Sequence, residues 1–212
     1  MRIVTISREF GSGGRELGKR LADLLECDYY DKEIIAAIAA NQNLDEGYVD
    51  RILDNHGWEK IPLSFRHTFI SSTTSMQTVL LVEQKKIIEQ IAKTGKDCVI
   101  VGRNADVLLS EYHPFNIFVC ANMDARVRRC LEVADGNENL SRKELERKIR
   151  SIDKNRAQTR EMITERKWGD QASYHIVVNT TDWAIKELAP AVKTFIESWF
   201  GRENEHSIIG SL

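Results

Sequence analysis

Residues 2–19 read RIVTISREFGSGGRELGK, and their order predicts the central unit of the fold. A short β-branched run over residues 3–6 predicts a strand, and leucines recur at helical spacing after a glycine cluster. Gly11, Gly13 and Gly14 can adopt positive φ angles and bring backbone N–H groups close to an anion, in front of the positive end of the helix. This order therefore predicts a phosphate-binding loop, although glycine clusters also form turns that bind nothing.

The loop departs from the phosphate-loop pattern GxxxxGK[ST]. If Gly13 is the second glycine of that pattern, Gly14 occupies the lysine position and Arg15 the hydroxyl position. If Gly14 is that glycine, Arg15 replaces the lysine. Either alignment lacks the usual Mg²⁺-ligating hydroxyl, so the charge near the β- and γ-phosphates has to come from Arg15 or Arg8.

Composition restricts the class of protein. The 212 residues are 42% apolar, which predicts one core domain over residues 1–201 with a frayed tail at 202–212. The formal net charge of −2 argues against nucleic acid as a partner. No apolar run approaches the ~20 residues that span a bilayer, and MRIVTISREF is not a signal peptide. We therefore expect a cytoplasmic protein without a membrane partner.

Further apolar runs alternate with helical patterns along the chain. Strands are expected at 98–101, 116–120 and 174–178, with a weaker one at 28–30. Helices are expected at 15–25, 31–40, about 75–94, 124–133 and 182–200, the last kinked or divided by Pro190, with a helical insertion at about 41–74. This alternation predicts an α/β fold whose parallel sheet is buried on both faces, with ligands at the carboxyl ends of its strands.

A second unusual region is the basic segment 141–167. It opens with a capping box, Ser141 with Glu144, and contains ten Lys or Arg residues against five acidic residues. Four cations lie roughly on one face: Arg150, Lys154, Arg156 and Arg160. They could converge on phosphates, or the segment could be a solvated helix with pairs such as Glu146 with Arg150.

With these features together, the sequence resembles the cytidylate kinase-like family, a branch of the P-loop nucleoside monophosphate kinases. The resemblance rests on ISREFGSGGRELG (6–18), DYYDKEII (28–35), VIVGRNAD (99–106), the basic run through Arg156 and Arg160, KWGD (167–170) and YHIVVNT (174–180). It implies a three-layer sandwich with about five parallel strands. It also implies a helical acceptor-binding region at about 31–95 and a mobile basic lid at about 137–170.

The resemblance also implies roles for individual residues. The donor ATP phosphates would bind Gly11, Ser12, Gly13, Gly14, Arg15 and Glu16. The acceptor would lie near Asp31, Lys32, Arg103 and Asn104, and the catalytic cations would be Arg15, Arg103, Arg156 and Arg160. These roles suit phosphoryl transfer, which needs in-line positioning and cations around the equatorial oxygens. An arginine such as Arg103 could instead form a structural salt bridge.

Two departures from the family pattern concern the metal and the acceptor. Val101 stands before Gly102 where such kinases usually have an aspartate, so Mg²⁺ would need Asp31, Asp106 or water-mediated support. The segment DKEIIAA after residue 30 lacks the serine- and arginine-containing acceptor signature, so recognition of cytosine is not supported.

Three hypotheses follow. The leading one is ATP-dependent phosphoryl transfer, with Mg²⁺, to a nucleoside monophosphate (cytidylate-like) or a related small phosphorylated acceptor. The alternative is a nucleotide-binding sensor on a kinase fold without turnover, because Gly14 stands where a lysine is usual. In a third, the basic segment is a nucleic-acid-binding helix, whose binding would weaken steeply with salt. The sequence leaves the oligomeric state open.

Overall fold

The structure, a computed structural model, describes residues 1–53, 66–133 and 141–209. Over these residues, five parallel strands form one sheet in the order β2-β3-β1-β4-β5. The strands are β1 (Ile3–Arg8), β2 (Asp28–Tyr30), β3 (Cys98–Val101), β4 (Phe115–Cys120) and β5 (Ile176–Asn179). Because β1 is the central strand, the glycine loop after it lies at the middle of the carboxyl edge of the sheet. The predicted α/β fold is confirmed.

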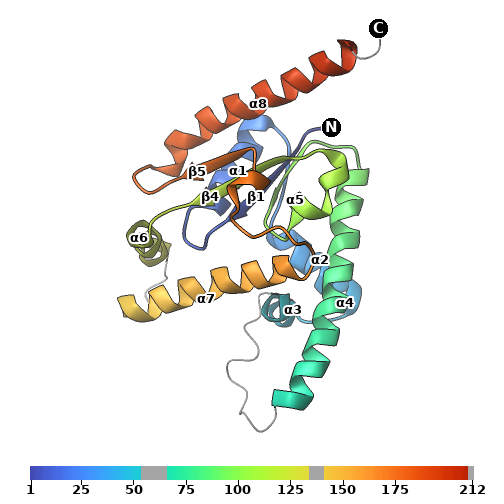
Figure 1. Ribbon diagram of the computed structural model, residues 1–212, viewed down its shortest axis with the longest axis vertical. Helices are drawn as coiled ribbons and strands as arrows, with labels where there is room; N and C mark the ends of the chain where they lie inside the picture. Colours follow the sequence, from blue (N-terminus) through green and yellow to red (C-terminus); the bar gives the residue numbers. More distant parts are fainter. Residues whose placement is uncertain (54–65, 134–140, 210–212) are drawn as a thin grey trace.

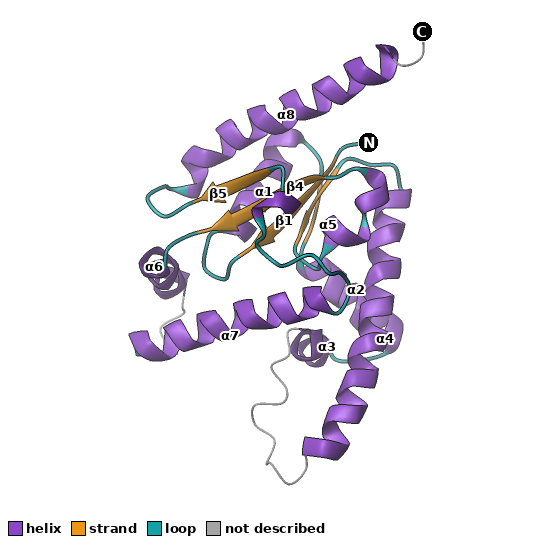
Figure 2. Ribbon diagram, viewed as in Figure 1, coloured by secondary structure: helices purple, strands orange, loops and turns teal. Residues whose placement is uncertain are grey.

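Helices cover both faces of the sheet (Figures 1 and 2). One face packs against α1 (Gly14–Leu25) and α8 (Ile185–Ile209). The other packs against α2 (Lys32–Gln42), α3 (Glu46–Leu53), α4 (Arg66–Lys93) and α5 (Ala105–Leu108). Helix α7 (Arg142–Glu161) passes between α6 (Met123–Val133) and α3 in Figure 1. The described residues also form the short 3-10 helices η2 (Ser110–Tyr112) and η3 (Gln171–Ser173).

Alternate residues of β1 enter different layers of the core. Ile3 packs with the α2–α5 layer, whereas Val4 and Ile6 pack with the α1–α8 layer, and all three are 1% exposed. This division follows from the twofold alternation of side chains along a strand. The prediction of strands buried on both faces is confirmed for β1 and β3, while the edge strand β5 is only half-buried.

Helix α8 corrects two expectations. It is not divided at Pro190 and continues past Gly201 to Ile209. A proline inside a helix costs about 3 kcal/mol. Ala189, Val192, Ile196 and Phe200 on this helix are buried against the α1 layer. Each of the larger ones contributes about 1.5–3 kcal/mol by burial, which together exceeds the cost of the proline.

Other helix and strand boundaries differ less from those expected from the sequence. Helix α4 begins at Arg66, earlier than the expected residue 75, and β5 begins at Ile176 after a short 3-10 helix. Helix α7 starts at the predicted capping box, in which Ser141 accepts a hydrogen bond from the N–H of Glu144. Residues 54–65 of the expected insertion, 134–140 at the expected start of the lid and 210–212 of the tail lie outside the described residues. Among the described helices, none has the length and apolar character to cross a membrane.

Candidate active site

The glycine loop connects β1 to α1. Gly11 and Gly13 have positive φ angles of 76° and 83°, and Gly13 is the N-cap of α1 without a side-chain cap. The first N–H groups of the helix have no intrahelical partner and remain available to an anion. A cleft of about 1320 Å³ lies over this helix end, and Gly14, Arg15 and Glu16 line it with the two other glycines. The geometry is that of a phosphate-binding loop.

Ser12 differs from its neighbours, because its side chain points away from the cleft. It is fully buried, and its hydroxyl donates to the carbonyl of Glu9 at 2.8 Å. Its own carbonyl accepts a hydrogen bond from Thr180 Oγ1 at 2.6 Å. The side chain of Ser12 therefore closes a turn within the loop, and its backbone carbonyl fixes the loop to Thr180, directly after β5. Ser12 is not among the residues that line the cleft, so the structure does not place its side chain at the expected phosphate contact.

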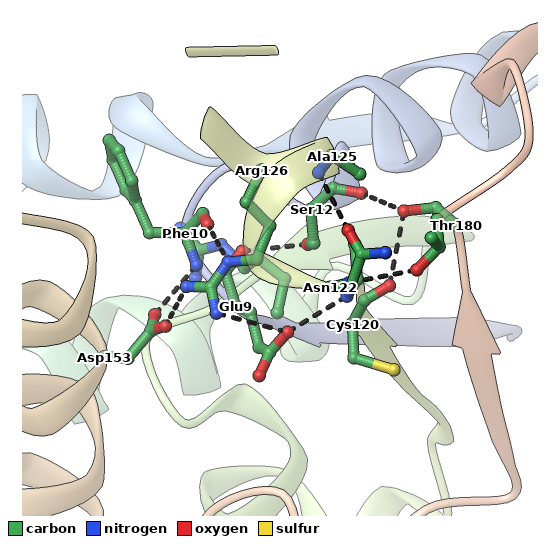
Figure 3. Close-up of polar contacts among 12 residues, drawn as sticks. Glu9, Phe10, Ser12, Cys120, Asn122, Ala125, Arg126, Asp153 and Thr180 are labelled. Carbon is green, nitrogen blue, oxygen red and sulfur yellow. Dashed lines mark hydrogen bonds and ion pairs between the residues drawn. The ribbon is translucent and has the colours of Figure 1, made fainter. Parts of the chain in front are cut away.

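The start of the loop is held by contacts with β4, α6 and α7 (Figure 3). Glu9 Oε2 accepts from the N–H of Ala121 at 3.0 Å, and Arg126 Nε donates to the carbonyl of Phe10 at 2.7 Å. Asp153 on α7 accepts from the N–H of Phe10 at 2.8 Å and pairs with Arg126. The basic helix is thus hydrogen-bonded directly to the phosphate loop.

Four arginines, Arg8, Arg15, Arg103 and Arg156, interact with one another beside the loop, and two of them contact one buried carboxylate. Asp31 is 4% exposed, and its oxygens lie 2.5 Å from Arg15 Nε and 3.6 Å from Arg8 Nη2. Burial, together with the positive charges of Arg156, Arg103 and Arg15, lowers the pKa of Arg8 to about 9, although Asp31 acts in the opposite direction. Closely spaced, desolvated cations are unfavourable without an anion. The cluster is therefore suited to bind a polyanion.

A second hollow, of about 50 Å³, lies on the other side of this cluster. Its lining residues are Ser7, Arg8, Leu53, Gln84, Gly102, Arg103, Asn104, Arg156, Thr159 and Trp168. Arg8 and Arg156 also line the large cleft. The two hollows therefore share these two arginines.

A family comparison agrees with this geometry. The model of the cytidylate kinase-like family matches residues 3–182. The chain belongs to the cytidylate kinase-like family. No curated protein matches it at a significant level.

Solved structures are similar to this family member over nearly its whole length. An uncharacterised protein from Eubacterium ventriosum has a TM-score of 0.68 and 23% identity, over 93% of this chain and 99% of that chain. The shikimate kinase from Bacteroides thetaiotaomicron has a TM-score of 0.55 and 15% identity, over 92% of this chain and 98% of that chain. A sugar kinase from Janibacter sp. has a TM-score of 0.53 and 13% identity, over 93% of this chain and 95% of that chain. At these identities the similarities establish a shared kinase fold.

The residues expected at the acceptor divide between the two hollows of this cytidylate kinase-like protein. Arg103 and Asn104 line the small cavity, where Arg103 Nη2 lies 2.9 Å from Asp50 and its carbonyl accepts from Gln84 at 3.0 Å. Asp31 and Lys32 line the large cleft instead. The structure therefore brings only part of the expected acceptor group together.

Arg160 and Asp106 contact each other away from both hollows. They are 1% and 5% exposed, and Arg160 Nη1 donates to Asp106 Oδ2 at 2.7 Å. Arg160 Nε also donates to the carbonyl of Arg166 at 3.1 Å, and its guanidinium lies 5.7 Å from the ring of Tyr174. Neither residue lines the cleft or the cavity. The pair is a buried ion pair that holds α7 against α5, and the expected roles of Arg160 as a lid cation and of Asp106 as a metal ligand stay predictions.

The ion pairs of Asp31 and Asp106 bear on whether these carboxylates can bind Mg²⁺. Asp106 is paired with Arg160, and Asp31 is paired with two arginines. Within the described part of the chain, no three His, Cys, Asp or Glu residues are grouped as metal ligands. The described residues therefore form no cage of protein ligands for Mg²⁺, and of the two expected candidates Asp31 lines the cleft while Asp106 does not.

Several site residues were not expected from the sequence. Arg129 Nη2 donates to the carbonyl of Trp183 at 3.2 Å and to that of Thr180, and Arg129 and Trp183 line the cleft. Leu131, Val133 and Trp183 are exposed apolar side chains in the same cleft, 53%, 81% and 54% exposed. Exposed apolar groups beside a phosphate loop are suited to a flat, apolar ligand group such as a nucleobase. Their positions in the sequence are scattered, so no spacing identified them.

Proposed function

We propose that this protein transfers the γ-phosphoryl group of ATP to a nucleoside monophosphate (cytidylate-like) or a related small phosphorylated acceptor. Family membership and the shared fold support a kinase-type enzyme. The large cleft has a glycine loop for the phosphates and exposed apolar side chains for the base of a donor nucleotide. ATP in this cleft would direct its terminal phosphate toward Arg8 and Arg156.

The composition of the small cavity supports a phosphorylated acceptor. Of the described residues, ten line it, and these include three arginines and no Asp, Glu or His. An alcohol acceptor loses a proton during transfer and needs a nearby base to take it. A monophosphate, with a second pKa of about 6, is already largely deprotonated at pH 7 and needs none. A cationic cavity without a base among its lining residues therefore favours phosphate over alcohol acceptors.

The reaction is balanced without a covalent enzyme intermediate. The bond between the γ-phosphorus and the oxygen that bridges to the β-phosphate breaks, and ADP leaves with that oxygen. A new bond forms between the γ-phosphorus and a phosphate oxygen of the acceptor. The arginines Arg8, Arg103 and Arg156 would stabilise negative charge on the transferring group and orient the acceptor, which is the main catalytic requirement of phosphoryl transfer.

An acceptor panel tests the proposal. ADP formation would be measured with ATP and Mg²⁺ and one acceptor at a time, the nucleoside monophosphates in one arm and shikimate and glucose in the other. We expect acceptor-dependent turnover in the phosphate arm only. Turnover only with an alcohol would refute the acceptor class. ATP binding without any acceptor-dependent ADP would instead support the nucleotide-binding regulatory protein.

A further inference from the structure

Residues 8 and 14 compete for the same space at the base of the glycine loop. A Cβ atom placed on Gly14 would lie 2.5 Å from Cβ of Arg8, 3.0 Å from its Cγ and 3.3 Å from Cβ of Val119. Real Cβ atoms essentially never come within 3.0 Å of another heavy atom. With this backbone, only one of the two positions can have a side chain.

The phosphate-loop pattern has its first glycine and its lysine six residues apart. Positions 8 and 14 are also six apart, with Gly13 in the place of the second glycine. This chain has an arginine where the pattern has glycine, and a glycine where the pattern has lysine. We propose that the cation and the glycine have exchanged places, so that Arg8 supplies from the end of β1 the catalytic charge that the pattern's lysine supplies from the helix.

The position of the Arg8 head group supports this assignment. Its side chain is 12% exposed and lines both the large cleft and the small cavity. Nη1 of Arg8 lies where a side chain on Gly102 would start, since a Cβ there would be 1.5 Å away. Glycines at 14 and 102 thus leave room for the stem and the head of one arginine. This path brings the charge to the point where the two ligand sites meet.

Arg15, the other cation available to replace the lysine, is placed differently. It takes the close contact with Asp31, at 2.5 Å, and its side chain is 59% exposed. Arg8 is 3.6 Å from the same carboxylate and is largely removed from water. A desolvated cation interacts more strongly with a phosphate than an exposed one does. Arg15 therefore neutralises Asp31, and Arg8 is left to act on the ligand.

The proposed exchange of cation and glycine between positions 8 and 14 rests on the proposed function. A cycle of four proteins tests it. Wild type, Arg8→Gly, Gly14→Lys and the double variant R8G/G14K would be compared for ADP release with ATP, Mg²⁺ and the nucleoside monophosphates. Affinity for the non-hydrolysable analogue AMP-PNP would be measured on each. We expect R8G to lose about 100-fold in rate. G14K should also lose rate because its Cβ meets Arg8, and R8G/G14K should regain at least about tenfold over R8G.

Matched controls separate this result from misfolding and from general charge loss. Melting temperatures show whether each variant folds, and Arg8→Lys keeps a cation at the original position and should retain more activity than R8G. Lys193→Ala removes one positive charge from an exposed pair on α8 and should leave the rate unchanged.

The outcomes distinguish the two proposals. A folded R8G with the wild-type rate, or a folded double variant no more active than R8G, would overturn the exchange and leave the proposed function intact. If wild type binds AMP-PNP but forms no ADP, the proposed turnover is refuted. The exchange is then tested by the AMP-PNP affinities, which should fall in R8G and in G14K and recover in R8G/G14K; no recovery would overturn it. If wild type binds no AMP-PNP, both proposals are refuted.

Discussion

The buried pair of Arg160 and Asp106 gives a prediction with a defined magnitude. Asp106→Asn keeps the shape of the side chain but leaves the Arg160 guanidinium, 1% exposed, without its counter-charge. Removing one partner of a buried pair costs about 3–5 kcal/mol. With a slope of about 2 kcal/mol per molar urea, a loss of about 4 kcal/mol lowers the unfolding midpoint by about 2 M. Urea unfolding followed by circular dichroism measures this shift.

A surface pair and a double variant complete the test. Glu197→Gln removes the partner of Lys193 in an exposed pair on α8 and should cost no more than about 0.5 kcal/mol. Replacing both buried partners, as Asp106→Leu with Arg160→Met, should restore most of the stability, because no unpaired charge remains. A midpoint for D106N within about 0.5 M of wild type would refute the structural role of the pair. Loss of ADP formation in the stable double variant would show that the pair acts in catalysis as well as in stability.

Three further predictions concern the loop and its cations. Asp153→Asn weakens the hydrogen bond from Phe10 N–H and should destabilise the protein by about 1.5–3 kcal/mol, with faster hydrogen exchange of the loop amides; unchanged exchange would contradict the link between α7 and the loop. Gly13→Ala should abolish AMP-PNP binding, because φ is +83° and the new Cβ would lie 2.5 Å from Ile185 Cδ1; adding Ile185→Ala removes the collision but not the backbone strain, so recovery should be partial. Burial lowers the pKa of Arg8 to about 9, so Arg8 is charged at pH 7, and binding of a phosphate favours the charged form. The affinity of wild type for AMP-PNP should therefore fall relative to that of R8G as the pH rises through about 9; parallel pH profiles of the two proteins would contradict this.

Local sequence predicted the parts of the molecule that depend on local geometry. The strand, glycine loop and first helix, the parallel sheet and the capping box at Ser141 all follow from residue order and spacing. The partner of Arg160 could not be predicted, because Asp106 lies 54 residues away and helical spacing identifies a face without showing what packs on it. The unbroken helix at Pro190 was missed for a related reason, since tertiary burial on both sides outweighs a local preference.

The steric conflict between side chains at positions 8 and 14 suggests how a phosphate-binding loop can be kept although its sequence does not match the usual pattern. The pattern GxxxxGK[ST] specifies which residue has the cation, but the physical requirement is one cation near the phosphates and one glycine where two backbone segments approach. A contact of 2.5 Å between the two Cβ positions makes the alternatives mutually exclusive. A single change at either position produces a collision or loses the charge, so an exchange must involve both positions together. The absent lysine at position 14 is therefore weak evidence for loss of turnover, and Arg8 is the residue on which the catalytic hypothesis depends.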